Sequence, residues 1–215
     1  MIHLSAPTLA RISTAELAPR AREQFGGDVR RAGTFAQLCL LGAQACLDGM
    51  PRRSSLGILW GSTYGAREAA RAAIREVADG ELVMPFTMIG TLPHLAATLL
   101  AQQGAPVMRA AFVHLQPAGW PWLLSLARAW LAGCEQVLLG WVEESAAAGE
   151  PHRSDWCVVQ REPAAVSCQA LGNPRDALPA TNADWLAQMG AWLAAPREPL
   201  ALRGGSEAWR FAAGR

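Results

Sequence analysis

The stretch that decides the fold is 107–144, VMRAAFVHLQPAGWPWLLSLARAWLAGCEQVLLGWVEE. Residues 107–114 are mostly apolar, as expected for a strand, and Gln116-Pro117-Ala118-Gly119 forms a sharp turn. The turn leads into an apolar helix over 120–132, which Gly133 ends. A further strand is expected over 136–142. This succession of strand, helix and strand predicts an α/β layer with parallel strands.

The residues before this stretch repeat the alternation. A buried strand is expected over 56–60, followed by helices over 66–77 and 94–103, the second with Pro93 in its first turn. Further upstream, 34–47 predicts a helix, and 13–31 predicts a loop with a short helix. The fold class is therefore α/β, with a mixed, mostly parallel sheet flanked by helices.

The last third of the chain has a different pattern. Short strands are expected around 156–160 and 165–170, then a helix over 182–193 and a hairpin at Gly204-Gly205. We therefore expect a main domain over 1–161. Residues 162–215 are expected to form a tail of hairpin and helix that packs on the same domain.

Composition excludes several classes of function. Half of the residues, 51%, are apolar and only 17% are charged, which excludes global disorder. The net charge of +1 does not favour nucleic-acid binding. The chain contains no lysine, so neither a Schiff-base lysine nor a phosphate-binding P-loop lysine can occur.

The cysteines and the N-terminus indicate where the protein works. The five cysteines include no CxxC pair, which favours free thiols in a reducing compartment. No secretory leader and no run of eighteen apolar residues is seen, so we expect a cytoplasmic protein without a membrane span. No cysteine–histidine grouping has zinc spacing, and no cofactor or metal is expected.

The order of motifs resembles the N-terminal half of the β-ketoacyl synthases. In that family a strand, a turn bearing the cysteine nucleophile, a buried helix, a glycine with an acidic residue, and a strand ending in GGVE follow one another. The matching residues here are Gly133, Glu135, Gly140, Val142 and Glu143. Counting back from Gly133 puts the nucleophile position on Gln116, and a one-residue error would put it on Leu115 or Pro117. None of the three is a cysteine.

Upstream residues extend the resemblance to about residues 30–145. The stretch 57–65, GILWGSTYG, is similar to the family's strand and glycine–serine turn. Met84-Pro85-Phe86 with Leu92-Pro93-His94 resembles its P…F…P-N segment, with His94 where asparagine is usual. The resemblance implies one half of a thiolase-like fold.

Glutamine cannot carry an acyl thioester, because its amide is not an ionisable nucleophile. In this respect Gln116 resembles the chain length factors of polyketide and polyene systems, which pair with an active ketosynthase. The alternative is that Gln116 is only a turn residue before Pro117. Family enzymes also use two histidines from their C-terminal half.

The histidines do not supply that pair. The chain has His3, His94, His114 and His152, and none beyond. We expect His114 to be a core or sheet histidine rather than a site residue close to Gln116. Because the chain is about half the family's length, the second half is expected to be missing or reduced to the tail.

The resemblance predicts a non-catalytic, chain-length-factor-like subunit in fatty acid, polyketide or aryl polyene type biosynthesis. Its expected partners are an active ketosynthase or a second copy, and an acyl carrier protein. Candidates for the substrate tunnel are Met84, Phe86, Met88, His94, His114 and Trp120. The alternatives are a malonyl-carrier-protein decarboxylase that uses Gln116, and a scaffold or carrier-docking module.

Two further expectations concern the quoted stretch. The helix over 120–132 is apolar on nearly all sides and must be buried on several of them, by a partner or by the tail. We expect an oligomer, and a monomer covered by its own tail is the alternative. Glu143 and Glu144 point to opposite faces of a strand, so we expect a solvated strand end rather than an acid/base pair or metal ligands.

Overall fold

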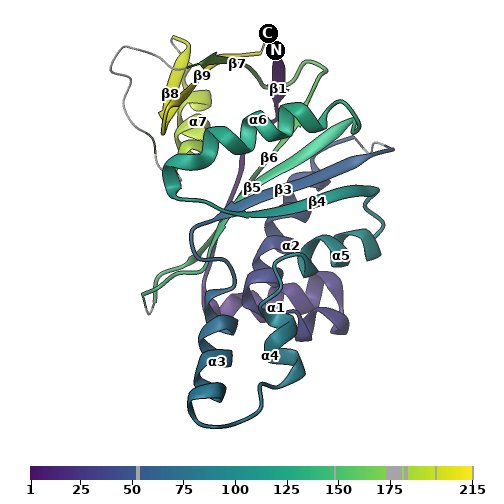
Figure 1. Ribbon diagram of the computed structural model, residues 1–215. Helices are drawn as coiled ribbons and strands as arrows, with labels where there is room; N and C mark the ends of the chain where they lie inside the picture. Colours follow the sequence, from purple (N-terminus) through teal and green to yellow (C-terminus); the bar gives the residue numbers. More distant parts are fainter. Residues whose placement is uncertain (52–53, 148, 173–180, 182–183, 197, 215) are drawn as a thin grey trace.

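The computed structural model describes residues 1–51, 54–147, 149–172, 181, 184–196 and 198–214 (Figure 1). Its strands are β1 (Ile2–Leu4), β2 (Thr8–Ile12), β3 (Leu56–Ser62), β4 (Val107–His114), β5 (Gln136–Glu143), β6 (His152–Gln160), β7 (Val166–Gly172), β8 (Leu200–Gly204) and β9 (Glu207–Ala213). Its helices are α1 (Thr14–Phe25), η1 (Gly27–Arg31), α2 (Gly33–Asp48), α3 (Arg67–Ala78), α4 (Pro85–Gly90), α5 (Leu95–Gln102), η2 (Pro117–Gly119), α6 (Trp120–Trp130) and α7 (Trp185–Ala194).

All of these strands join one mixed sheet in the order β4-β3-β5-β6-β1-β7-β9-β8, with β2 paired to β6. Only β4, β3 and β5 run parallel, and helices connect them. Every other pairing is antiparallel, so the predicted mostly parallel sheet is wrong. The reason is the connections. After β5 the chain turns back into β6, and β8 turns back into β9; a short connection can join only antiparallel neighbours.

Helices cover the sheet on both faces (Figure 1). One face packs against α2, whose sixteen residues include ten that are buried, and against α1 and α5. The backbone of α2 lies close to β6, because a Cβ on Gly42 would lie 2.2 Å from Oγ of Ser154. That hydroxyl donates to the carbonyl of Leu38 (2.8 Å) and accepts from Nε1 of Trp156 (2.8 Å). A glycine is therefore required where helix and strand meet.

The tail covers α6 on the other face. The indole of Trp120 stacks on Trp185 of α7, with centroids 4.9 Å apart and planes at 13°, and Phe211 of β9 lies 6.3 Å from it. Nε1 of Trp120 donates to the carbonyl of Thr181 (3.1 Å). The helix is therefore buried between the sheet, α7 and the β8–β9 hairpin. The domain boundary at residue 161 stays a prediction.

Most elements of the first 145 residues lie where the sequence predicts them, with two corrections. Residues 13–31 hold a full helix, α1, with a capping box in which Ser13 and Glu16 bond each other's backbone N–H. This capping signal was in the sequence and was missed. Residues 83–91, for which the sequence predicts a loop rich in apolar residues, contain the helix α4, which starts at Pro85.

We predict that Trp185→Ala lowers the free energy of unfolding by about 3–5 kcal/mol, because it opens a cavity against Trp120 and Phe211. Urea unfolding followed by circular dichroism measures the loss. The matched control is Trp122→Ala on α6, where the side chain is 46% exposed and the expected loss is below about 1 kcal/mol. Equal losses for the two variants would show that the tail does not stabilise α6.

Candidate functional site

Gln116 lies at the corner where β4 ends and η2 begins. Its backbone is extended, with φ −60° and ψ 149°, and its carbonyl accepts the N–H of Gly119 (2.8 Å). The N–H of Leu115 donates to the carbonyl of Ser62 on the neighbouring strand (3.2 Å), which holds the end of β4 in place. The Gln116 side chain is exposed and has no hydrogen-bond partner among the described residues.

The turn after Gln116 offers few donors for an anion. Pro117 and Pro121 have no N–H group, and the N–H of Gly119 already bonds to Gln116. Stabilising a thiolate or an oxyanion at a helix start needs free backbone N–H groups. The side chain of Gln116 itself offers no ionisable nucleophile at this corner.

The tail also closes one side of the corner. Gly204, at the end of β8, packs so closely on η2 and α6 that a Cβ there would lie 2.4 Å from the carbonyl oxygen of Ala118. The same Cβ would lie 2.7 Å from Cδ of Pro121. Backbone of the β8–β9 hairpin thus occupies the space beside the turn, so a substrate cannot approach from that side.

Polar groups gather where β3 and β5 end. The hydroxyl of Ser62 donates to Oε2 of Glu143 (3.0 Å), and Oε1 accepts from the N–H of Thr63 (2.5 Å) and from Nε1 of Trp141 (3.1 Å). Glu143 therefore holds the loop after β3, and the predicted solvated strand end is wrong. The sequence did contain a signal for this contact. Ser62 and Glu143 each end a predicted strand, and the ends of adjacent parallel strands meet at the same edge of the sheet.

Glu144 lies on the opposite face, as predicted for neighbouring strand residues, but it is also buried. Its Oε2 accepts the N–H of Glu68 in the first turn of α3 (2.6 Å), while Oε1 has no partner among the described residues. Burial raises the pKa of Glu144 to about 7; the bond from the Glu68 N–H opposes this rise, and the Glu68 carboxylate adds to it. The start of α3 therefore rests on a carboxyl group that titrates near neutrality.

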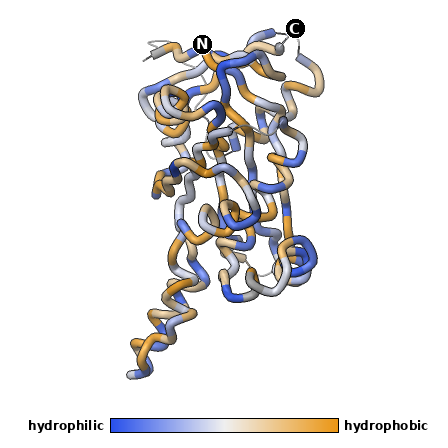
Figure 2. The backbone as a smooth tube through the Cα atoms, turned by 90° about the vertical axis from the view of Figure 1, so that its right-hand side faces the viewer, coloured by the Kyte–Doolittle hydropathy of each residue, from blue (hydrophilic) through white to orange (hydrophobic). Residues whose placement is uncertain are grey.

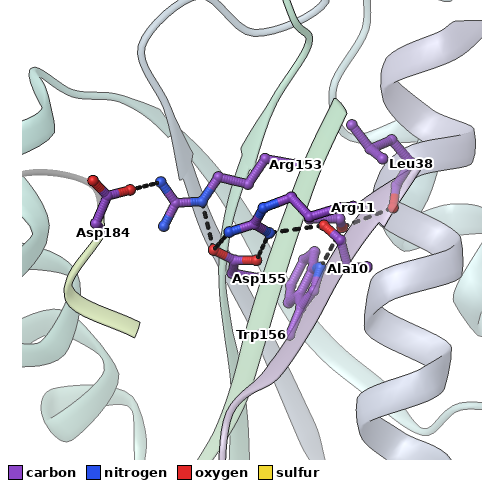
Figure 3. Close-up of polar contacts among 8 residues, drawn as sticks. Ala10, Arg11, Leu38, Arg153, Asp155, Trp156 and Asp184 are labelled. Carbon is purple, nitrogen blue, oxygen red and sulfur yellow. Dashed lines mark hydrogen bonds and ion pairs between the residues drawn. The ribbon is translucent and has the colours of Figure 1, made fainter. Parts of the chain in front are cut away.

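A buried ion-pair network joins β2, β6 and the start of α7 (Figure 3). Asp155 is fully buried and accepts from both Arg11 and Arg153, the latter through Nε at 2.5 Å. Nη1 of Arg153 also donates to Asp184 just before α7 (2.5 Å). The two arginines pair the buried carboxylate and join β2 to β6, and the contact of Arg153 with the exposed Asp184 links β6 to the start of α7.

The predicted tunnel residues lie in three places. His94 and His114 come together through an aromatic cluster: His94 packs on Trp60 (5.8 Å) and His114 on Phe112 (4.8 Å), with Trp60 and Phe112 in contact. Trp120 is fully buried on the other face of the sheet.

Met84, Phe86 and Met88 lie in and beside α4 and are half exposed. Phe86 lines a cavity of about 560 Å³ between α2, α3 and α4. The structure thus separates Trp120 from the histidines and from the α4 residues. His152 is buried elsewhere, at the start of β6, with Nε2 3.1 Å from the hydroxyl of Thr14 and Nδ1 accepting the N–H of Ser145 (3.0 Å).

The fold is similar to those of ketosynthases and chain length factors. A chain of the ketosynthase (ApeO) in complex with its chain length factor (ApeC) from Xenorhabdus doucetiae aligns with a TM-score of 0.65 at 15% identity, over 99% of this chain and 97% of that one. The ishigamide ketosynthase/chain length factor aligns with a TM-score of 0.54 at 16% identity, over 73% of this chain and 54% of that one.

A third structure, AntDE:AntF, is a type II polyketide synthase acyl carrier protein in complex with its ketosynthase. It aligns with a TM-score of 0.54 at 11% identity, over 83% of this chain and 65% of that one. The chain thus spans nearly all of one similar chain and under two thirds of the other two. No family model matches the sequence, and no curated protein matches it. At these identities the similarity shows a condensing-enzyme fold of the ketosynthase and chain length factor type.

The helices of the described ranges are all too short or too polar to cross a membrane.

Glu144 predicts a pH dependence of stability. Because its pKa is raised from 4.5 to about 7 in the folded protein, the folded state binds its proton more tightly, and its contribution to the free energy of unfolding falls as pH rises from about 4.5 to 7. We expect Glu144→Gln to unfold like the wild type at pH 5 and to be more stable by about 2 kcal/mol at pH 8. Urea unfolding at both pH values measures this, with exposed Glu150→Gln as control. If the difference in unfolding free energy between Glu144→Gln and the wild type were the same at pH 5 and pH 8, the raised pKa of Glu144 would be contradicted.

Proposed function

We propose that this chain is a non-catalytic, chain-length-factor-like subunit that pairs with an active ketosynthase in fatty acid, polyketide or aryl polyene type biosynthesis. The observation that carries the proposal is Gln116, an amide without a nucleophile, at the strand-to-helix corner of a ketosynthase-like fold. The prolines of the turn and the covering Gly204 support the non-catalytic role.

The free edge of β4 is the surface that we assign to the pairing. Among the described strands β4 pairs with β3 alone, so its other edge presents unpaired backbone groups over eight residues. Only Arg109 in β4 carries a full charge, and Met108 is 67% exposed. Natural edge strands are usually protected by charge, proline or a cover, so a long unprotected edge fits strand pairing with another subunit.

In the complex, this chain would also line part of the substrate tunnel and meet the acyl carrier protein. Met84, Phe86 and Met88 would contribute apolar wall to a tunnel shared with the ketosynthase, which holds the growing chain on its acyl carrier protein. His94 and His114 would lie behind that wall through Trp60 and Phe112. A tunnel completed only in the complex accounts for the exposure of these apolar side chains in the single chain.

Co-expression with an active ketosynthase from the same organism tests the proposal. We expect a stable complex of one chain of each in size-exclusion chromatography with light scattering. Mass spectrometry should find acyl groups on the ketosynthase and none on this chain. Gln116→Ala should keep the complex and change product length. A chain that ignores the ketosynthase, or that itself becomes acylated, would contradict the proposal.

The edge of β4 has its own prediction. Met108→Lys places a charge on the free edge and is expected to weaken the complex by at least ~10-fold in Kd. The control is Leu9→Lys on β2, which is 43% exposed and lies away from that edge. Biolayer interferometry measures both variants, and equal affinities would move the pairing surface elsewhere.

The decarboxylase alternative rests on the same glutamine. It requires carbon dioxide release from malonyl-carrier protein by the chain alone, lost in Gln116→Ala. We expect no release above the rate without protein, because the turn offers few N–H donors for the enolate that decarboxylation would form.

A further inference from the structure

A small cavity lies where the last turn of α6 meets the strands of the tail. Its volume is about 210 Å³, and it is lined by Arg128 of α6, Trp209 of β9, residues 168–170 of β7 and residues 1–2 at the start of β1. Figure 2 marks the start of β1 with N, at the opposite end of the molecule from α3 and α4 (Figure 1). Gln116 precedes the other end of α6. The cavity is therefore separate from the corner at Gln116 and from the apolar residues of α4.

The length of β1 explains why this space is open. The ladder between β1 and β7 ends at the pair of Ile2 and Cys168, whereas β7 continues to Gly172. On the side of β1, the β7 backbone at Gln169 and Ala170 therefore has no ladder partner among the described strands. Backbone groups that a ladder leaves unpaired need another partner, which can be water or a ligand.

The cavity wall contains a hydrogen-bond donor without a partner. Trp209 is 1% exposed, and its Nε1 has no acceptor among the described residues. The indole N–H groups of Trp60 and Trp185 also lack an acceptor in this part of the chain, but of the three only Trp209 lines this cavity. A buried N–H group that has lost water without gaining an acceptor is destabilising, so an acceptor supplied by a ligand would be favourable here.

Arg128 adds a positive charge to the same wall. Its guanidinium carbon lies 5.8 Å from the centre of the Trp209 ring, and its side chain is exposed. Within the described ranges Arg128 takes part in no ion pair, so it can turn aside and admit a ligand to the indole edge that it covers. Its planar fork of N–H groups is then free to bind an anion.

No other charge at the cavity cancels that of Arg128. Four elements line it, β1, β7, β9 and α6, and Glu207 is their only acidic residue. The Glu207 carboxylate accepts from the hydroxyl of Ser125 (3.2 Å), and Glu207 does not line the cavity. Arg210 and His3 point to the opposite face of the sheet, because their neighbours in β9 and β1 face α6. A ligand in the cavity therefore meets one unbalanced positive charge.

Size and polarity indicate the class of ligand. At about 210 Å³ the cavity is smaller than the roughly 300–1,000 Å³ of pockets for drug-sized ligands. Ile2, Ala170 and the Trp209 ring supply apolar surface. Burial raises the pKa of the Cys168 thiol to about 12, against the opposing effect of nearby positive charges, so this side chain is neutral at pH 7. The cavity thus fits a small molecule with one anionic group and an apolar body.

We propose that this cavity binds a short-chain carboxylate, anchored by Arg128 and by the indole N–H of Trp209. Arginine pairs both oxygens of a carboxylate through parallel N–H groups, and the indole N–H donates to one of them. One arginine balances the single charge of a carboxylate, whereas a phosphate dianion would need a second cation. The bound ligand joins α6 to β7 and β9 and so ties the helix to the tail. This inference is independent of the proposed function.

Titration with sodium propionate at constant ionic strength tests the inference. The nine tryptophans give nine indole N–H signals in ¹H–¹⁵N spectra, and Trp209→Phe identifies the signal of Trp209 as the one that it removes. We expect propionate to shift that signal saturably in the wild type. Arg128→Gln should weaken binding by at least ~10-fold in Kd, and Trp209→Phe, followed by calorimetry, by about 3-fold. The matched control is Arg22→Gln, an exposed arginine on α1, which should bind like the wild type.

Two further probes test the chemical class. Propionamide has the same shape without the charge and should leave the Trp209 signal unshifted, and inorganic phosphate should bind more weakly than propionate. The inference is overturned if propionate does not shift the Trp209 signal, if Arg128→Gln binds as tightly as the wild type, or if propionamide binds equally well. Tighter binding of phosphate would assign the cavity to a different anion and also overturn it. Thermal unfolding without ligand checks that each variant is folded.

Discussion

The burial of α6 is the constraint on which the rest of the structure depends. A helix with apolar side chains on nearly every side cannot remain at a surface, so the chain must cover it twice. The parallel strands β3, β4 and β5 cover one side, and the stack of Trp120, Trp185 and Phe211 covers the other. Arg153, which pairs with the buried Asp155, also pairs with Asp184 and so links the sheet to the start of α7. The position of Gln116 follows, because it begins the turn into α6.

Three separate features of this corner support the proposed non-catalytic role. The side chain is an amide, the prolines remove N–H donors, and the hairpin at Gly204 fills the space beside the turn. Together they favour a subunit whose contribution is surface and shape, which agrees with the exposed apolar residues of α4 and the free edge of β4.

The carboxyl ends of the parallel strands keep a polar network without a nucleophile. Glu143 bonds Ser62 and the loop after β3, and Glu144 bonds the first turn of α3. Both glutamates thus position the loop after β3 and the start of α3. The same row of strand ends that carries chemistry in an α/β enzyme here fixes these two segments.

The sequence by itself determined the elements whose signals are local: the strand Val107–His114, the turn at Gln116, the apolar α6 and the glycine that ends it. These follow from periodicity and turn chemistry within one window. Tertiary structure alone decided the sheet's mostly antiparallel pairing, the burial of Glu144 and the separation of Trp120 from His94 and His114. Strand direction depends on how distant segments pair, and burial depends on which element covers a residue. The capping box of α1 was local and was missed, whereas the exposure of apolar residues in α3 and α4 depends on which of the described elements pack on them.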